Sequence, residues 1–365
     1  MKKITLILAI MMANTFLFAA KRTVSNVLTN PAQYSNLQAA IDASAYGDTL
    51  YIHPSTINYG SIVINKKLTL LGPGYDGRSY QRNEVAKIGS VSLSYNGIIS
   101  SSSYSSFIGL YITSSINPTY DSCHHITLAR NVLASNVSLG TGNSFSTSWS
   151  IFNNIINGSI YIYDKVGNLM SNNHFTSGGN CISSNGANPG PNGVYNNNFS
   201  SIFQLAGTGI LQTSNVQYYN NIFNNLNTAG QNVDILINSP TYVNNTFTKN
   251  LTYYISNNLP PLFNNNNNGS GNINNQNPLF TNAPTFGMTF NSDSIVSYNF
   301  RLLPASPGKN MGTDATDIGV YGGGYPFKND QGITALPQVT QLIILNPAVP
   351  LNNSLNVNSK GKKRD

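Results

Sequence analysis

The chain of 365 residues contains only 8% charged residues, about a third of the share usual in globular domains. Its formal charge of +7 is concentrated at the ends, in Lys2, Lys3 and residues 360–365, so residues 21–359 carry only +2. Such a weakly charged body lacks the basic stripe of a nucleic-acid-binding protein, and we exclude nucleic acid as a partner. Glu84 is the only glutamate, and asparagine, serine, glycine and tyrosine favour strands and turns over long helices.

The first 20 residues have the pattern of a secretory signal peptide. Lys2 and Lys3 form a basic end, residues 4–18 are apolar, and Ala19-Ala20 offers small residues for cleavage. This apolar stretch of about fifteen residues is short for a membrane span of roughly twenty. We therefore expect an exported protein, extracellular or in the cell envelope, whose mature chain has no transmembrane segment.

The region after the signal peptide predicts one short helix and then strands. Ser35 and Gln38 have the spacing of a capping box, and apolar residues recur at helical intervals over residues 37–45. Residues 48–52 then predict a strand. Further apolar alternations broken by Gly, Ser, Asn or Pro predict strands at 62–65, 68–72, 91–93 and 107–112.

A five-residue phrase built on an asparagine pair recurs between residues 151 and 247. Its first asparagines are Asn153, Asn172, Asn196, Asn220 and Asn244, which stand 19, 24, 24 and 24 residues apart. A period in the low twenties is typical of a solenoid, in which each coil covers its neighbour. Alternate side chains of a strand share a face, so positions −1, +1 and +3 are expected to point inward, with the inward asparagines hydrogen-bonded in a ladder.

The assignment of positions −1, +1 and +3 to the inward face predicts which side chains form the core. The phenylalanines at position +3 are expected to form one internal column: Phe175, Phe199, Phe223 and Phe247. Tyr195 and Tyr219 should lie inside, and His174 should be a lone surface histidine. Cys123 and Cys181 occupy different phases of the repeat, so we expect both to be buried and no disulfide to join them.

The fold class that we predict is all-β: a right-handed parallel β-helix of about ten coils over residues 21–330, with an N-terminal capping helix. Residues 264–277 are rich in asparagine and glycine and are expected to be an exposed loop. Residues 331–365 fall outside the repeat and predict one or two strands and a basic tail. These strands are expected to pair with the last coil or with each other, and we expect a role in surface retention.

Two segments carry a resemblance to a known family. Residues 37–43 (LQAAIDA), 47–50 (GDTL) and 64–72 resemble the N-terminal cap of pectin-lyase-like right-handed parallel β-helix proteins. Residues 300–323, from FRLLPASP to DIGVYGG, are similar to the end cap of exported proteins of that kind. The resemblance covers roughly residues 30–325. It implies the fold and leaves the activity open, because this fold carries lyases, hydrolases, adhesins and inert scaffolds.

Acidic residues are too sparse for hydrolysis or for a metal site. Glycoside hydrolysis needs two carboxyl groups about 5–9.5 Å apart. Between residues 85 and 292 the only acids are Asp121, Asp164 and Asp234, which fall two or three coils apart, about 10–14 Å. The Asn-Thr-Asp, Asp-Asp and Gly-His-Gly motifs of polygalacturonases are missing. Calcium would need clustered carboxylates and zinc a third ligand, so we expect neither a metal nor a cofactor.

A metal-free lyase is the alternative function. Its candidate catalytic residues are Tyr120, Asp121, His125 and Arg130. Arg130 would neutralise the carboxylate of a uronate-containing glycan, and His125 or Tyr120 would move the proton in a β-elimination. The other interpretation of this cluster is a loop followed by an outward arginine at a corner.

Sugar binding without catalysis is the function that we expect. The chain has 21 tyrosines, whose rings can stack on sugars, and the candidate binding residues are Tyr161, Tyr163, Tyr218 and Tyr242. The sequence therefore predicts an exported β-helix scaffold that binds polysaccharide or a cell-surface glycan, or otherwise acts at the cell surface.

Overall fold

The computed structural model describes residues 19–29, 31–74, 85–94, 101–119, 123–140, 146–163, 166–176, 180–184, 192–195, 197–201, 211–225, 242–253, 266–283, 298–327, 338–344 and 357–362. Most of the predicted signal peptide, residues 1–18, lies outside these ranges. The described parts contain one helix, α2 (Leu37–Ala43), and strands in three parallel sheets and two antiparallel pairs. Within these ranges no helix has the length and apolar character needed to cross a membrane.

The three parallel sheets, here called A, B and C, are stacked in chain order. Sheet A contains β1 (Lys21–Val24), β2 (Thr49–Ile52), β4 (Thr69–Leu71), β7 (Ser106–Ile108), β10 (Thr127–Ala129), β13 (Ser150–Phe152), β16 (Leu169–Ser171), β19 (Asn192–Tyr195), β22 (Val216–Tyr219), β24 (Thr246–Thr248) and β26 (Asn268–Ser270). Sheet C contains β5 (Lys87–Ile88), β8 (Tyr111–Ile112), β11 (Val132–Leu133), β14 (Ile155–Ile156), β17 (His174–Phe175), β20 (Asn198–Ser201), β23 (Ile222–Asn225) and β25 (Leu251–Tyr253). Sheet B contains β3 (Ile62–Ile64), β6 (Val91–Leu93), β9 (Ile116–Pro118), β12 (Val137–Ser138), β15 (Ile160–Tyr161), β18 (Ile182–Ser183) and β21 (Leu211–Gln212).

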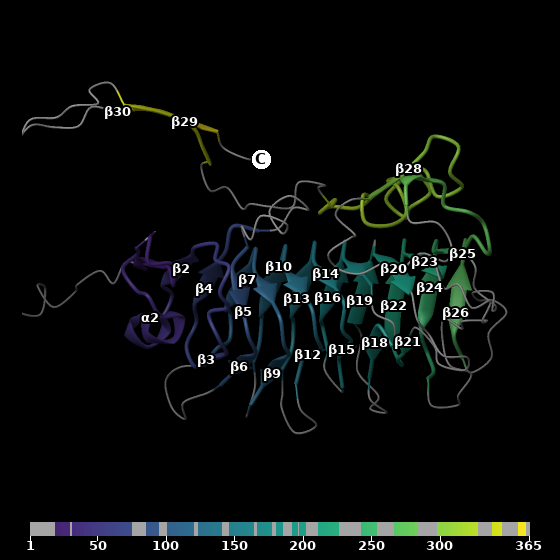
Figure 1. Ribbon diagram of the computed structural model, residues 1–365. Coiled ribbons are helices and arrows are strands. Elements are labelled where there is room, and N and C mark those ends of the chain that lie inside the picture. The colour runs from purple at the N-terminus through teal and green to yellow at the C-terminus, as the bar shows by residue number, and fades with distance from the viewer. Residues whose placement is uncertain are drawn as a thin grey trace, which may run out of the picture.

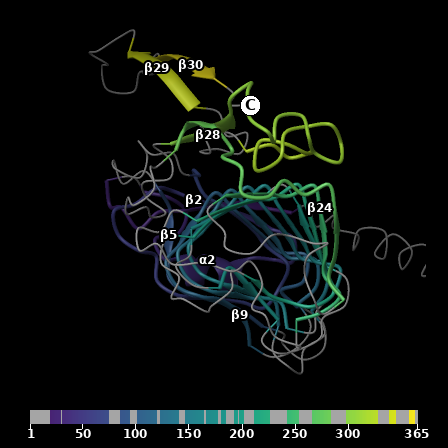
Figure 2. The same cartoon turned by 90° about the vertical axis from the view of Figure 1, so that its right-hand side faces the viewer.

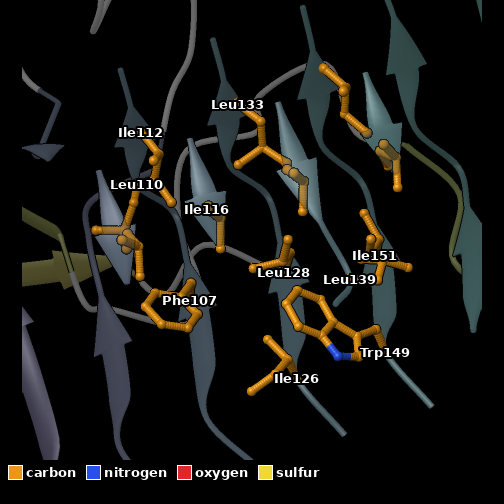
Figure 3. Packing of buried hydrophobic residues seen from close by; sticks show 14 of the residues in the cluster. Phe107, Leu110, Ile112, Ile116, Ile126, Leu128, Leu133, Leu139, Trp149 and Ile151 are labelled. Carbon is orange, nitrogen blue, oxygen red and sulfur yellow. The ribbon is translucent and has the colours of Figure 1, made fainter. Parts of the chain in front are cut away.

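The chain passes through sheets A, C and B in turn, so strands that pair within a sheet come from successive coils, as with β10, β11 and β12 and then β13, β14 and β15. This arrangement is a parallel β-helix, seen from the side in Figure 1 and obliquely along its axis in Figure 2. Inward side chains of the three sheets meet in the middle and form one continuous core. Figure 3 shows Phe107, Leu128 and Trp149 among the apolar side chains that fill it.

The corner between sheets A and C carries the asparagine ladder. The first residue of this corner adopts the left-handed conformation, with φ between +52° and +58° at Arg130, Asn153, Asn172, Asn220 and Lys249. The next residue is a buried asparagine whose Oδ1 accepts the backbone N–H of its counterpart one coil earlier, at 2.8–3.0 Å. The ladder runs through Asn131, Asn154, Asn173, Asn197, Asn221, Asn250 and Asn272. The predicted ladder is therefore present.

The prediction that position −1 points inward is wrong. The left-handed residue turns the chain, so the residues on either side of it no longer share a face as they would in a continuous strand. Tyr195 and Tyr219 consequently lie on the outer face of sheet A, partly exposed, with their rings stacked on each other. The residue before Tyr219, Tyr218, is the one that points into the core.

The predicted phenylalanine column is correct for three of its four members. Phe175, Phe199 and Phe223 stack in sheet C with ring centroids 4.5 and 4.7 Å apart. Phe247 lies in sheet A, where it stacks on Tyr218 at 4.8 Å. The reason is a longer coil, because the ladder step from Asn221 to Asn250 is 29 residues and moves the last asparagine phrase to the corner that enters sheet A.

The helix α2 lies at the N-terminal end of the stack (Figure 1). Its N-cap is Asn36, whose Oδ1 accepts the Ala39 N–H at 2.9 Å, and not Ser35 as the capping-box spacing predicted. Leu37, Ala40 and Ile41 are fully buried and belong to the continuous core. The helix therefore covers apolar groups that the first coils would otherwise expose.

Residues 298–327, here called the strap, run back along the outer face of sheet C. Its described contacts extend from the coil of Lys249, whose Nζ donates to the Gly312 carbonyl, back to Phe152, which packs against Tyr325. Most of this segment had been predicted as an end cap. Its apolar residues instead pack against outward residues of sheet C, such as Ile155 and Ile222. The strap begins with β28 (Asn299–Leu302), antiparallel to β27 (Phe280–Asn282).

Three remaining predictions have definite outcomes. The expected loop at 264–277 contains β26 and the ladder residue Asn272, so that expectation is wrong for the residues described there. At the C-terminus β29 (Gln338–Ile344) pairs antiparallel with β30 (Val357–Lys362), one of the two predicted alternatives, and Figure 1 shows this hairpin apart from the stack. Cys123 and Cys181 are both buried and are not joined by a disulfide, as predicted.

Candidate functional site

The predicted catalytic residues are not assembled around one centre in the described structure. Tyr120 and Asp121 lie outside the described residues. His125 and Arg130 occupy the corners at opposite ends of β10, with φ of +54° and +56°. Five residues of nearly extended chain span about 16 Å. The imidazole and the guanidinium therefore belong to different corners of the coil, one before β10 and one after it.

The His125 side chain is exposed and has an aromatic neighbour. Its ring stacks on Tyr104, with centroids 4.6 Å apart, and Lys67 Nζ lies 6.0 Å from the centre of the Tyr104 ring. These three residues occupy successive coils, two positions before the strands β4, β7 and β10. The adjacent His124 bonds Thr147 Oγ1 through Nδ1 at 2.9 Å, and desolvation lowers the pKa of His124. Together these residues place polar and aromatic groups along the corner at which the chain enters sheet A.

Of the four predicted binding tyrosines, the structure brings two together on the surface. Tyr161 and Tyr163 are partly exposed beside sheet B, with ring centroids 6.3 Å apart. Tyr242 is partly buried and packs against the core. The prediction that Tyr218 binds a ligand at the surface is wrong, because its side chain is fully buried. Its hydroxyl is hydrogen-bonded to Thr213 Oγ1 at 2.7 Å, and burial raises the pKa of that hydroxyl.

The outer face of sheet A holds the aromatic pair that the sequence interpretation missed. From β2 to β26 its strands place two outward residues each, which form two rows along the stack; in β1 the same positions hold Lys21 and Thr23. Row 1 is Thr49, Thr69, Ser106, Thr127, Ser150, Leu169, Gly193, Gln217, Thr246 and Asn268. Row 2 is Tyr51, Leu71, Ile108, Ala129, Phe152, Ser171, Tyr195, Tyr219, Thr248 and Ser270. In row 2 the rings of Tyr195 and Tyr219 are stacked, with centroids 5.2 Å apart and planes inclined by 17°.

The position of the Tyr195 ring depends on a glycine in the same strand. A Cβ added to Gly193 would lie 2.6 Å from Cε2 of Tyr195, so the ring edge occupies the space that a side chain would take. The ring thereby carries its hydroxyl across to row 1, where it donates to Gln217 Oε1 at 3.3 Å. Desolvation and the neighbouring Tyr219 raise the pKa of Tyr195, which keeps this hydroxyl protonated as a donor.

Replacing Gly193 with alanine is expected to displace the Tyr195 ring and destabilise the protein by about 1–3 kcal/mol, the usual cost of overpacking. The measurement is the free energy of unfolding from a urea titration, followed by tyrosine fluorescence. Gly324→Ala is the control, since an added Cβ there meets nothing within 4 Å. Equal stability of the two variants would contradict the tight packing of Tyr195 on Gly193.

The two rows are uncharged from β2 to β26. Over these strands neither row contains an acidic or basic residue; the nearest cations are the exposed Lys21 of β1, which is in register with Thr49, and the corner residues Lys67 and Arg130. In the part of the chain that is described, no three His, Cys, Asp or Glu side chains gather as metal ligands would. No protein-family model matches the chain, and no curated protein matches it.

Proposed function

We propose that this protein is an exported, non-catalytic scaffold that binds a glycan at the cell surface through the outer face of sheet A. The stacked pair Tyr195–Tyr219 carries the proposal, because it offers apolar ring surface and hydroxyl groups together at the protein surface, the combination with which sugars are bound. Both rings lie on strands of a rigid stack, which limits the conformational entropy lost on binding.

The same proposal includes the handedness of the fold, its number of coils, its family and its cap. We infer a right-handed β-helix of about ten coils related to the pectin-lyase-like family, with α2 as its N-terminal cap. The support is the segment LQAAIDA at 37–43, which forms α2 at the end of the stack, followed by the parallel coils. The separation of His125 from Arg130 at opposite ends of β10 supports binding over elimination.

Binding is tested by affinity electrophoresis of the purified protein through gels that contain individual polysaccharides, neutral and acidic. Tyr195→Ala and Tyr219→Ala are expected to weaken retention about tenfold or more, since truncating an aromatic anchor costs roughly 2 kcal/mol. Tyr161→Ala tests the other surface pair, Tyr161 and Tyr163 of sheet B; it should be retained like the wild type, and weaker retention would place the binding site there instead.

Two results would overturn this function. One is equal migration of the wild type and both sheet A variants through every polysaccharide. The other is release of unsaturated product from an acidic polysaccharide by the wild type, abolished in His125→Ala or Arg130→Ala. That second result would establish the lyase in place of the binding scaffold.

A further inference from the structure

Five neighbouring strands of sheet A present an unbroken line of hydroxyl groups. The line is the first half of row 1: Thr49, Thr69, Ser106, Thr127 and Ser150. All five side chains are partly exposed, and their hydroxyls have no hydrogen-bond partner among the described residues. Neighbouring strands of a sheet are about 4.8 Å apart, so the hydroxyls repeat at that interval along a straight axis.

An apolar line runs beside the hydroxyls. Two residues further along the same strands stand the first five members of row 2: Tyr51, Leu71, Ile108, Ala129 and Phe152. Ala129 is buried and Phe152 packs against Tyr325 of the strap, so Tyr51, Leu71 and Ile108 supply most of the exposed apolar surface. Two residues of strand advance about 6.6 Å, so the hydroxyl line and the apolar line are parallel and close enough to contact one ligand together. The two lines are here called the strip.

The strip leads toward the tyrosine pair. After Ser150 row 1 continues through Leu169 to Gly193, where the Tyr195 hydroxyl takes the place of a side chain, and then to Gln217. Polar groups that both donate and accept are thus present on most coils from β2 to β22.

The chemistry of the strip fits an uncharged sugar chain. Serine and threonine hydroxyls each donate and accept, as sugar hydroxyls do, whereas a face built for anions would hold cationic donors. The C–H faces of sugar rings suit the apolar line. A sugar ring in an extended chain is about as long as the separation of neighbouring strands, about 4.8 Å. One sugar can therefore meet one coil over several successive coils.

We propose that the strip binds an unbranched, uncharged polysaccharide in extended form, lying along the helix axis with about one sugar per coil. The inference rests on the proposed glycan-binding function and assigns its ligand class and its site. Affinity therefore rises with chain length until the strip is filled, and it is insensitive to salt because no ion pair is formed.

The experiment uses the full mature chain and calorimetric titration with β-1,4-linked glucan and mannan oligosaccharides of increasing length. In the test variant Ser106→Ala and Ser150→Ala are combined, which removes two hydroxyls of the strip. In the matched control Ser92→Ala and Ser138→Ala are combined; these serines are outward and partly exposed in β6 and β12 of sheet B. We expect roughly tenfold weaker binding by the test variant, as for two lost hydrogen bonds, and wild-type binding by the control.

The outcomes separate the ligand class from the proposed function. In one outcome neutral oligosaccharides bind, Tyr195→Ala abolishes their binding, and the double serine variant binds like its control. The strip is then not the binding site, although the protein still binds a glycan. If only charged chains bind, and Lys21→Ala, Lys67→Ala or added salt releases them, the ligand class is wrong. If the wild type binds no glycan of either kind, both proposals fail. Melting temperatures near that of the wild type establish that each variant is folded.

Discussion

The Asn197→Ala variant is expected to lose about 3–5 kcal/mol of unfolding free energy, although the substitution removes few atoms. Asn197 is fully buried, and its Oδ1 accepts both the backbone N–H and the side-chain amide of Asn173, at 2.8 and 3.0 Å. Its own amide donates to the Met170 carbonyl and to Asn221 Oδ1, each at 3.0 Å. Alanine leaves the Asn173 donors without an acceptor, and an orphaned buried polar group costs about 1–3 kcal/mol.

The effect is measured by urea denaturation at neutral pH. Asn117→Ala is the control, because Asn117 is an outward, exposed asparagine of β9 whose amide bonds only Ser115 Oγ among its described neighbours. That variant should stay within about 0.5 kcal/mol of the wild type. A similarly small change in Asn197→Ala would show that the ladder contributes little to stability. Equal losses of unfolding free energy at both positions would show that the loss does not come specifically from the ladder.

Stability is expected to fall as the pH is lowered from 6.5 towards 3, and His174 is expected to supply up to about 5 kcal/mol of that loss. The side chain was predicted to be a surface histidine, but the strap buries it between Phe300 and Phe327, at ring distances of 4.8 and 4.6 Å. Desolvation lowers the pKa of His174 to about 3. In the unfolded chain the imidazole takes up a proton below about pH 6.5, whereas in the folded protein it stays neutral until about pH 3, so acid favours unfolding.

The measurement is the unfolding free energy of the wild type and of His174→Phe at several pH values from 7 to 4. Phenylalanine keeps an aromatic ring between Phe300 and Phe327 and removes the titration. The other ionisable groups, including the Lys309–Asp317 pair of the strap, are common to both proteins and cancel in the difference. The wild type should lose stability relative to the variant as the pH falls. Parallel curves would mean that the strap does not hold His174 buried in solution.

Both predictions come from contacts between residues far apart in the sequence, yet they differ in how much the sequence revealed. The asparagine ladder could be predicted because a repeated polar pair amid apolar residues must find partners when it is buried, and the period supplies those partners from the next coil. The burial of His174 could not be predicted from the repeat. It results from the strap, and the sequence from Phe300 onward contains no pattern that indicates which face of the stack the strap covers.

The outward stack of Tyr195 and Tyr219 was missed for a local reason. An alternating pattern assigns faces only while the backbone stays extended, and one left-handed residue at each corner reverses the assignment. Asparagine is enriched in that conformation, so the asparagine pair itself was the signal that would have placed the tyrosines outside. Gly193, two residues before Tyr195, was a second signal, since it makes room for the ring.

By itself the sequence determined the parallel stack, its period, its buried asparagines and most of its inward apolar residues, because these follow from short-range periodicity repeated many times. The tertiary structure alone decided which face the strap covers, where the longer coil between Asn221 and Asn250 shifts Phe247, and that the hydroxyls of row 1 form one straight line. These features depend on the register between coils and on packing between distant segments, which no local pattern encodes.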